Sequence, residues 1–145
     1  MSFLDDVREA KRTEIARLRL DPPRVAALSD PGFRRALRGP GLSVIAEIKR
    51  RSPSKGDLSP GLDAAKTARA YAEAGAASIS CLTDSNFFGA RASDLAQART
   101  AGLPVLRKDF LIDEIQIDES VRLGAAAVLF IVRILEAGRL EALLR

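Results

Sequence analysis

The feature that most constrains the fold is a unit that occurs four times, in which a glycine is followed within a few residues by an apolar, strand-like segment. The segments cover residues 43–48, 78–82, 105–106 and 128–132, and they follow Gly41, Gly75, Gly102 and Gly124. Amphipathic helical patterns lie after each segment, at residues 62–74, 92–100, 113–123 and 135–144. Strands that alternate with helices in this way predict right-handed βαβ units and a parallel sheet.

The length of the chain limits how large that sheet can be. A parallel α/β sheet is either open and doubly wound or closed into an eight-stranded barrel, and a complete barrel needs about 250 residues. The chain has 145 residues, of which residues 1–40 are expected to form a helical extension before the first strand. Residues 41–145 then hold about four βα units, which is roughly half of such a barrel.

Composition excludes several kinds of chemistry. The chain has no histidine and one cysteine, Cys81, so it cannot assemble a Cys/His zinc site or a Ser-His-Asp triad. Cys81 is expected to be a small buried strand residue, and acid–base catalysis falls to Lys, Glu, Asp or Tyr. The apolar stretches are shorter than the roughly 20 residues of a membrane span, and residues 1–6 do not resemble a secretory signal. We therefore expect a cytoplasmic protein with neither a bound metal nor a membrane partner.

The net charge of +4 is unevenly distributed, because the first twenty residues contain Arg8, Lys11, Arg12, Arg17 and Arg19. Such a segment is either a surface that contacts phosphate or RNA, or an amphipathic helix docked through a face formed by Leu4, Val7, Ile15 and Leu18. No aromatic residues are interleaved with the basic ones, which favours the docked helix. No nucleic-acid partner is expected.

Two of the strand-like segments place charged residues at their carboxyl ends. Glu47 and Lys49 are two residues apart and so share one face, and Lys108 shares a face with Phe110 in the third unit. Sites of parallel α/β proteins lie at these strand ends, so both lysines are expected to reach one site. A lysine near another cation and apolar groups has a lowered pKa, which suits a general acid. The alternatives are a surface ion pair of Glu47 with Lys49 and a structural ion pair of Lys108 with Glu47 or Asp109.

The loops after these strands supply further candidates. Residues 50–56, Arg-Arg-Ser-Pro-Ser-Lys-Gly, have the polar composition of a loop that contacts phosphate. Phe87 and Phe88 adjoin each other in a polar segment, which is typical of a wall for a flat aromatic ligand. A hydrophobic plug under the loop is the alternative for Phe87. Leu129 and Ile131 face the barrel interior by alternation, where filling of the core is the default interpretation.

Three motifs carry a family resemblance. Residues 44–56 read Val-Ile-Ala-Glu-Ile-Lys-Arg-Arg-Ser-Pro-Ser-Lys-Gly, residues 82–89 read Leu-Thr-Asp-Ser-Asn-Phe-Phe-Gly, and residues 104–113 read Pro-Val-Leu-Arg-Lys-Asp-Phe-Leu-Ile-Asp. In this order and at these separations they resemble the indole-3-glycerol phosphate synthase family, the decarboxylating cyclases of tryptophan biosynthesis. The resemblance implies an α/β fold, namely the N-terminal half of a (β/α)8 TIM barrel preceded by an N-terminal helical extension.

The resemblance also implies a substrate and roles for individual residues. The substrate is 1-(2-carboxyphenylamino)-1-deoxyribulose 5-phosphate, an anionic sugar phosphate with an anthranilate ring, and no cofactor is expected. Lys108 would be the general acid that protonates the carbonyl of the ring-opened sugar, Glu47 would hold Lys108 and share in proton handling, and Lys49 would contact the phosphate or carboxylate. The other implied substrate contacts are Ser52 and Pro53 beside the first strand, and Phe88, Phe110 and Leu129 around the anthranilate ring.

Strands five to eight of the family barrel are not in this chain, and with them a second catalytic glutamate, an asparagine of the ring site and the loops that hold the phosphate. We expect either a fragment of a longer gene product or a half-barrel that needs the C-terminal half or a second copy along its open edges. No appreciable synthase activity is expected of the chain alone. The alternatives are a non-catalytic half-barrel assembly module and another phosphate-binding barrel, such as phosphoribosylanthranilate isomerase.

Overall fold

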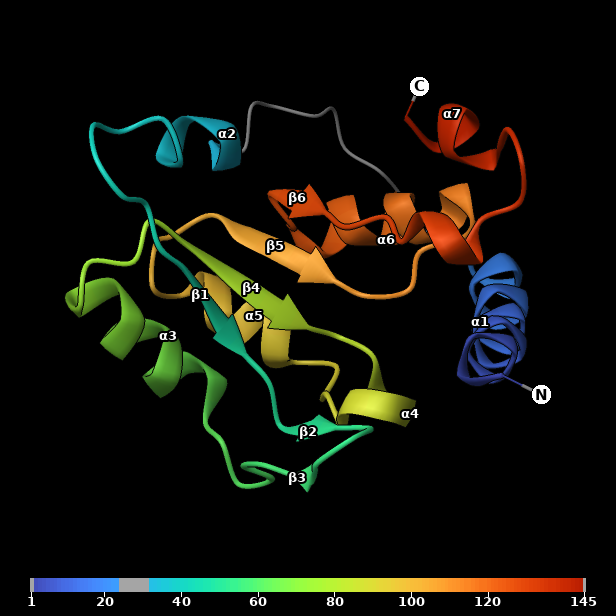
Figure 1. Ribbon diagram of the computed structural model, residues 1–145, viewed down its shortest axis with the longest axis horizontal. Helices are drawn as coiled ribbons and strands as arrows, with labels where there is room; N and C mark the ends of the chain where they lie inside the picture. Colours follow the sequence, from blue (N-terminus) through green and yellow to red (C-terminus); the bar gives the residue numbers. More distant parts are fainter. Residues whose placement is uncertain (1, 24–31, 145) are drawn as a thin grey trace.

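A computed structural model describes residues 2–23 and 32–144 of the chain, and a four-stranded parallel sheet lies at its centre (Figure 1). The strands are β1 (Ile45–Ile48), β4 (Ser78–Leu82), β5 (Val105–Lys108) and β6 (Ala127–Val128), in the spatial order β1-β4-β5-β6. Each neighbouring pair is parallel. Because spatial order follows chain order, the sheet is built from successive βαβ units, and the expectation of a parallel α/β fold is confirmed.

Helices connect the strands and precede them. The α-helices are α1 (Phe3–Leu20), α2 (Phe33–Ala36), α3 (Ala64–Glu73), α4 (Ser85–Phe88), α5 (Asp94–Arg99), α6 (Glu114–Leu123) and α7 (Arg139–Leu143). A 3₁₀ turn, η1 (Val132–Ile134), precedes α7, and a short antiparallel hairpin is formed by β2 (Arg51–Ser52) and β3 (Gly56–Asp57). In this part of the chain no helix is long and apolar enough to cross a membrane.

One face of the sheet forms the hydrophobic core with α3 and α5. Residues of alternating register point to this face, namely Ile48, Ile79, Cys81 and Val105, and they pack against alanines and a leucine of the two helices: Ala64, Ala68, Leu95 and Ala98. Cys81 is fully buried, and this burial raises the pKa of its thiol to about 12. It is therefore a strand residue of the core, as expected, and it is a poor nucleophile.

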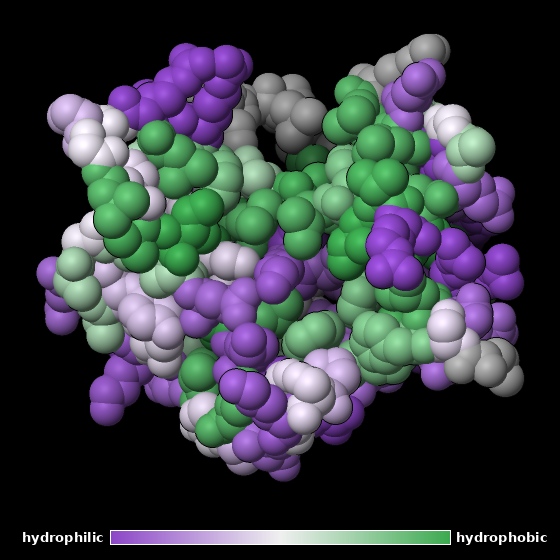
Figure 2. All heavy atoms as spheres, in the orientation of Figure 1, coloured by the Kyte–Doolittle hydropathy of each residue, from purple (hydrophilic) through white to green (hydrophobic). Residues whose placement is uncertain are grey.

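The opposite face of the sheet is open. Figure 1 looks onto it, with α5 behind the strands. Figure 2, from the same side, shows hydrophobic side chains on either side of a hydrophilic patch over the carboxyl ends of β1 and β4. Ile45, the first residue of β1, shares this face with Glu47 and is 44% exposed. This face is the one that would line the interior of a closed barrel.

The N-terminal helix α1 packs beside α6 and against the segment after β6. Its Val7 is buried in one cluster with Phe110 and Ile134. The helix ends at Leu20, just before Pro22 and Pro23, which cannot continue it. Residues 24–31 of the expected 1–40 extension lie outside the described residues, so its division from residues 41–145 stays a prediction.

The fourth βα unit differs from its prediction. The expected strand over 128–132 is reduced to Ala127–Val128, because β5 pairs with it at only two positions and the chain then turns into η1. The expected helix over 135–144 begins only at Arg139, because Gly138 is in the left-handed region with φ 77°. The apolar pattern of residues 128–135 thus belongs to a short strand and a turn that pack on the core around Phe110.

Candidate active site

Three of the predicted site residues contact each other at the carboxyl ends of β1 and β5. Glu47 Oε2 accepts a hydrogen bond from Lys108 Nζ at 3.0 Å, and Glu47 Oε1 lies 2.9 Å from Lys49 Nζ. All three side chains are partly accessible, with 33% of Glu47, 34% of Lys49 and 38% of Lys108 exposed. A carboxylate flanked by two ammonium groups and open to solvent can bind an anionic ligand and transfer protons.

Sheet register explains why residues 61 positions apart meet. Glu47 pairs with Ser80 of β4, and Ser80 pairs with Leu106 of β5, so the three share one face. Lys108 lies two residues beyond Leu106 and therefore on the same face, one step nearer the carboxyl end. The small side chain of Ser80 between the two strands leaves space for Lys108 to reach across β4.

The two lysines keep the glutamate ionised. Partial burial acts to raise the pKa of Glu47, but hydrogen bonds from Lys49 and Lys108 outweigh it and hold the pKa below its usual value of 4.5. The backbone of β1 is fixed at this point by Tyr71 of α3, whose hydroxyl donates to the Glu47 carbonyl at 3.0 Å. At neutral pH Glu47 is therefore an acceptor that orients both ammonium groups.

The structure distinguishes between the partners considered for Lys108. Its ion pair is with Glu47, whereas Asp109 contacts Lys11, Thr83 and Arg107. This divergence follows from the strand, in which successive side chains point to opposite faces. Lys108 therefore faces the open side of the sheet.

Aromatic rings lie beside this group. Phe110, two residues past Lys108, packs against Phe88 of α4 with their ring centroids 6.0 Å apart and the ring planes tilted by 35°. Phe87 instead contacts Phe3 of α1 and Phe110, edge to face, at 5.2 and 6.1 Å. Phe87 thus packs as a hydrophobic plug, the alternative considered for it, while Phe88 and Phe110 form the aromatic pair nearest the strand ends.

The remaining candidates lie around the same strand ends. Ser52 belongs to β2 and Pro53 to the turn of the β2–β3 hairpin, which lies against α4, and Ser52 Oγ is 3.0 Å from Ser54 Oγ. Leu129 follows β6 directly, two residues beyond the partner of Leu106, and is half-buried. These residues follow the carboxyl ends of β1 and β6, two strands of the same parallel sheet.

Part of the polar 50–56 segment has a structural role that the sequence did not indicate. Arg50 is 4% exposed and makes a two-pronged hydrogen bond to Asp94 of α5, at 2.8 Å from Nε and 2.6 Å from Nη2. A third hydrogen bond runs from Nη1 to the Pro60 carbonyl at 3.1 Å. The arginine therefore fastens the loop after β1 to α5, and its guanidinium is fully engaged by the protein.

A second buried ionic group connects α1 to the strand ends. Lys11 is 1% exposed and lies 2.7 Å from Asp109 Oδ1 and 3.0 Å from Asp84 Oδ2. Arg107, also buried, contacts the other oxygen of Asp109 at 3.1 Å. A signal was present in the sequence, because Lys11 is four residues from both Val7 and Ile15 and so lies on the apolar face of the helix. Three of the five basic residues near the N-terminus contact residues outside α1, namely Arg8, Lys11 and Arg19, which favours the docked helix.

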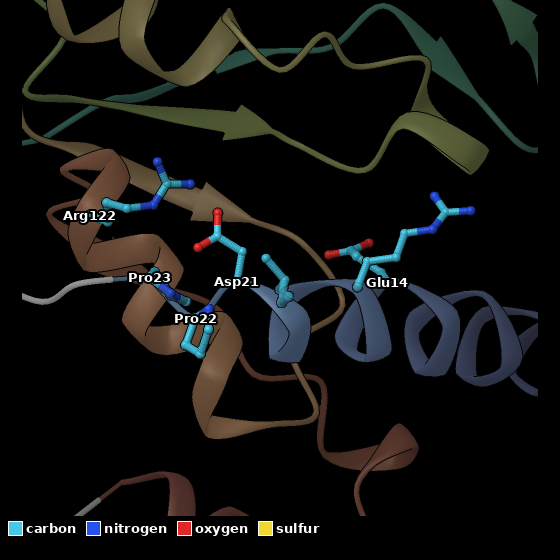
Figure 3. Close-up of a pocket in the computed structure, with 7 residues that line it drawn as sticks. Glu14, Asp21, Pro22, Pro23 and Arg122 are labelled. Atoms are coloured by element: carbon cyan, nitrogen blue, oxygen red, sulfur yellow. The ribbon is translucent and has the colours of Figure 1, made fainter.

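A separate hollow lies beside the end of α1, away from the Glu47 group. It has a volume of about 630 Å³, and Figure 3 shows the side chains of Asp21 and Arg122 entering it from α1's end and from α6. Its lining includes two acidic and two basic side chains, Glu14, Asp21, Arg17 and Arg122. With this balance the hollow has no charge selectivity for an anionic sugar phosphate.

Fold and site define a class: parallel α/β proteins of the barrel type with an ion-paired lysine–glutamate group at the carboxyl ends of their strands. Within that class the chain belongs to the indole-3-glycerol phosphate synthase family, whose model matches residues 4–145. This match favours the synthase over the isomerase family.

Individual relatives agree with this. The chain is 45% identical over 142 residues to an indole-3-glycerol phosphate synthase of Syntrophobacter fumaroxidans, covering 90% of this chain and 54% of the relative. It is 47% identical to the synthase of Exiguobacterium sibiricum, with coverages of 97% and 56%, and 51% identical to indole-3-glycerol phosphate synthase 2 of Streptomyces coelicolor, with coverages of 94% and 50%. The chain therefore spans about half the length of these relatives.

Proposed function

We propose that the complete protein converts 1-(2-carboxyphenylamino)-1-deoxyribulose 5-phosphate into indole-3-glycerol phosphate, carbon dioxide and water. The observation that carries this proposal is the contact of Glu47 with both Lys49 and Lys108 on the open face of the sheet. Membership of the synthase family and the names of the relatives support it. The proposal includes a cytoplasmic location. It also includes no cofactor, because the acid–base groups are side chains of the protein.

In this proposal Lys108 is the general acid. Its ammonium donates a proton to the carbonyl oxygen of the open-chain sugar while the ring carbon that bears the carboxylate bonds to the carbonyl carbon, so the C=O double bond becomes a hydroxyl. The ring carbon then loses its carboxylate as carbon dioxide, the hydroxyl leaves as water, and the amine of Lys108 recovers a proton from solvent or through Glu47. Glu47 holds the ammonium in place with its 3.0 Å hydrogen bond. Lys49, on the other oxygen of Glu47, is free on its remaining sides to contact the phosphate or carboxylate of the substrate.

The ring and loop residues bind the substrate. Phe88, Phe110 and Leu129 pack on the anthranilate ring, with Phe88 and Leu129 offering the larger area because Phe110 is only 6% exposed. Ser52 and Pro53, in the hairpin beside α4, line the site next to β1. The two lysines give the site a positive charge that suits the two anionic groups of the substrate.

The test is a steady-state assay of indole-3-glycerol phosphate formation by the purified complete protein. Lys108→Met is expected to lower kcat by about 100- to 10,000-fold, the usual contribution of a general acid. Lys66→Met, on the exposed face of α3, is the matched control and is expected to leave kcat within about twofold. No product from the wild-type protein, or full activity of Lys108→Met, would overturn the proposal.

A further inference from the structure

The buried ammonium of Lys11 lies between Asp84, which precedes α4, and Asp109, which follows β5. Both segments contain residues of the candidate site. The ammonium is contributed by α1, far from the sheet in sequence, and lies 2.7 Å from Asp109, 3.0 Å from Asp84 and 2.7 Å from Glu14. Lys11, Asp84 and Asp109 each have about 1% of the side chain exposed. Charges buried to this extent are retained only when they are paired, so the position of each group depends on the other two.

Each of the two aspartates fixes the backbone of a site element. Asp84 caps α4 and accepts the Phe87 amide at 2.6 Å, which sets the start of the helix that carries Phe88. Asp109 directly follows Lys108 and accepts the Phe110 amide at 2.7 Å. A shift of Asp84 therefore moves the aromatic wall, and a shift of Asp109 moves the general acid.

Among the described residues, Lys11 is the cation that joins these two carboxylates. Arg107 also contacts Asp109, but it has no contact with Asp84. Asp84 Oδ2 accepts no hydrogen bond from any residue in the described part of the chain, so its charge is compensated by the nearby ammonium. Burial acts to raise the pKa of Asp109, and the attraction of Lys11 is the largest influence that lowers it.

We propose that Lys11 is a positioning residue of the active site: through Asp84 and Asp109 it fixes the relative placement of Phe88 and Lys108, so the N-terminal helix takes part in catalysis without touching substrate. The proposal rests on the proposed function for its kinetic consequence. Its structural part, the tie between the two loops, stands independently of any activity.

The kinetic test uses the complete protein with rates expressed per folded molecule. Lys11→Met is expected to lower kcat by about 10- to 100-fold with KM changed less than about threefold, because a displacement of about 1 Å in reacting groups costs up to roughly 100-fold. Arg12→Met, one position along on the exposed side of α1, is the control and keeps kcat within about twofold.

A second variant separates positioning from simple loss of stability. Lys11→Met/Asp84→Asn removes one buried carboxylate together with the lysine, and asparagine still caps α4. The double variant is expected to recover most of the lost thermal stability while kcat stays low, since α1 no longer holds the two loops. Recovery of kcat together with stability would show that Lys11 is only structural and would overturn the proposal.

Amide hydrogen exchange tests the tie without an activity. In Lys11→Met, exchange at the Phe87 and Phe110 amides is expected to rise about tenfold or more relative to Ile79 in β4, because their carboxylate acceptors lose the cation that holds them. Unchanged exchange at both amides would overturn the proposal. If exchange rises as expected but the wild-type protein forms no indole-3-glycerol phosphate, the proposed function fails while the tie between the loops stands.

Discussion

Arg50 and Asp94 show how much single residues contribute to this fold. The pair is almost completely buried, and its hydrogen bonds hold the loop after β1 against α5. Burial acts to raise the pKa of Asp94, but its hydrogen bonds from the Arg50 side chain and the Arg91 amide outweigh burial and hold it below the usual 3.8. The Asp94 carboxylate therefore binds a proton more readily in the unfolded chain than in the folded one. For this reason Asp94 stabilises the fold above about pH 4, and it loses that effect as the pH falls through its lowered pKa.

Replacing Asp94 by asparagine tests this contribution. Asp94→Asn is expected to lower the free energy of unfolding at pH 7 by about 3 kcal/mol, because it leaves the Arg50 guanidinium buried without its counter-charge. By urea denaturation, the wild-type protein is expected to lose stability as the pH falls from about 5 through the lowered pKa of Asp94, where the aspartate takes up its proton. Asp94→Asn should lose less over this interval.

Asp57→Asn is the matched control, because Asp57 is exposed in β3. It is expected to change the free energy of unfolding by less than about 0.5 kcal/mol and to keep the wild-type pH profile. Equal acid lability of Asp94→Asn and the wild type would show that the buried pair does not stabilise the fold.

Local patterns were sufficient to predict some of these residues and not others. The period-two alternation of a strand predicts that Glu47 and Lys49 share one face and that Lys108 and Phe110 share one face. Because sites of parallel α/β proteins lie at the carboxyl ends of the strands, it also predicts that these two pairs lie close together. The partners of Arg50 and Lys11 come from distant elements, and only the packing of helices on the sheet determines them. A basic residue beside a polar loop fits a ligand contact and a buried ion pair equally well in sequence.

At the scale of elements, a helix end with a capping residue is predictable from the sequence, as both ends of α6 show, whereas the start of α7 is not. The helix α6 begins after Asp113, which forms a capping box with Gln116, and it ends at Gly124 in the left-handed region with φ 77°. The length of β6 could not be predicted in the same way, because a strand extends only as far as its neighbour pairs with it. The residues after Val128 have strand-like composition but no β-ladder partner in the described part of the chain.

Glycine substitutions test the element ends. Gly124→Ala is expected to lower the free energy of unfolding by about 1 to 2 kcal/mol. Left-handed strain is the main cost, and the exposed Arg99 guanidinium, whose Cζ would lie 2.3 Å from the new Cβ, must move aside and give up its hydrogen bond to the Leu123 carbonyl. Gly75→Ala, with φ 87° and open space around it, carries the strain alone and is expected to cost about 1 kcal/mol.

Gly61→Ala is the control for both variants. Gly61 does not have a left-handed φ, and no atom lies within 4 Å of the position that an alanine Cβ would take. The free energy of unfolding of Gly61→Ala should therefore stay within about 0.5 kcal/mol of the wild type. Urea denaturation of the three variants measures these differences in the free energy of unfolding. Equal decreases for Gly124→Ala and Gly75→Ala would show that Arg99 moves aside without cost.

At the scale of the whole molecule, the described chain forms a sheet with one covered and one open face. β1 and β6 are its edges, each with one neighbour among the described strands. The open face combines the exposed Ile45 at the start of β1 with the Glu47 group at its end. An open apolar face with unpaired edges favours association with further strands, and the chain spans only about half the length of the relatives it matches.

The 145-residue chain expressed alone is therefore expected to associate and to lack synthase turnover. Sedimentation velocity is expected to show species larger than the 15.6 kDa monomer. The assay for indole-3-glycerol phosphate is expected to stay at background, while the complete protein turns over. A monodisperse monomer with turnover equal to that of the complete protein would contradict this expectation.

The most direct measurement is a double-mutant cycle on kcat for indole-3-glycerol phosphate formation by the complete protein, with Glu47→Gln, Lys108→Met and the two combined. Because Glu47 acts through its hydrogen bond to Lys108, the double variant is expected to be within about threefold of Lys108→Met alone. Losses that multiply, or a wild-type protein that forms no product, would contradict the assignment of the two residues to one acid–base group.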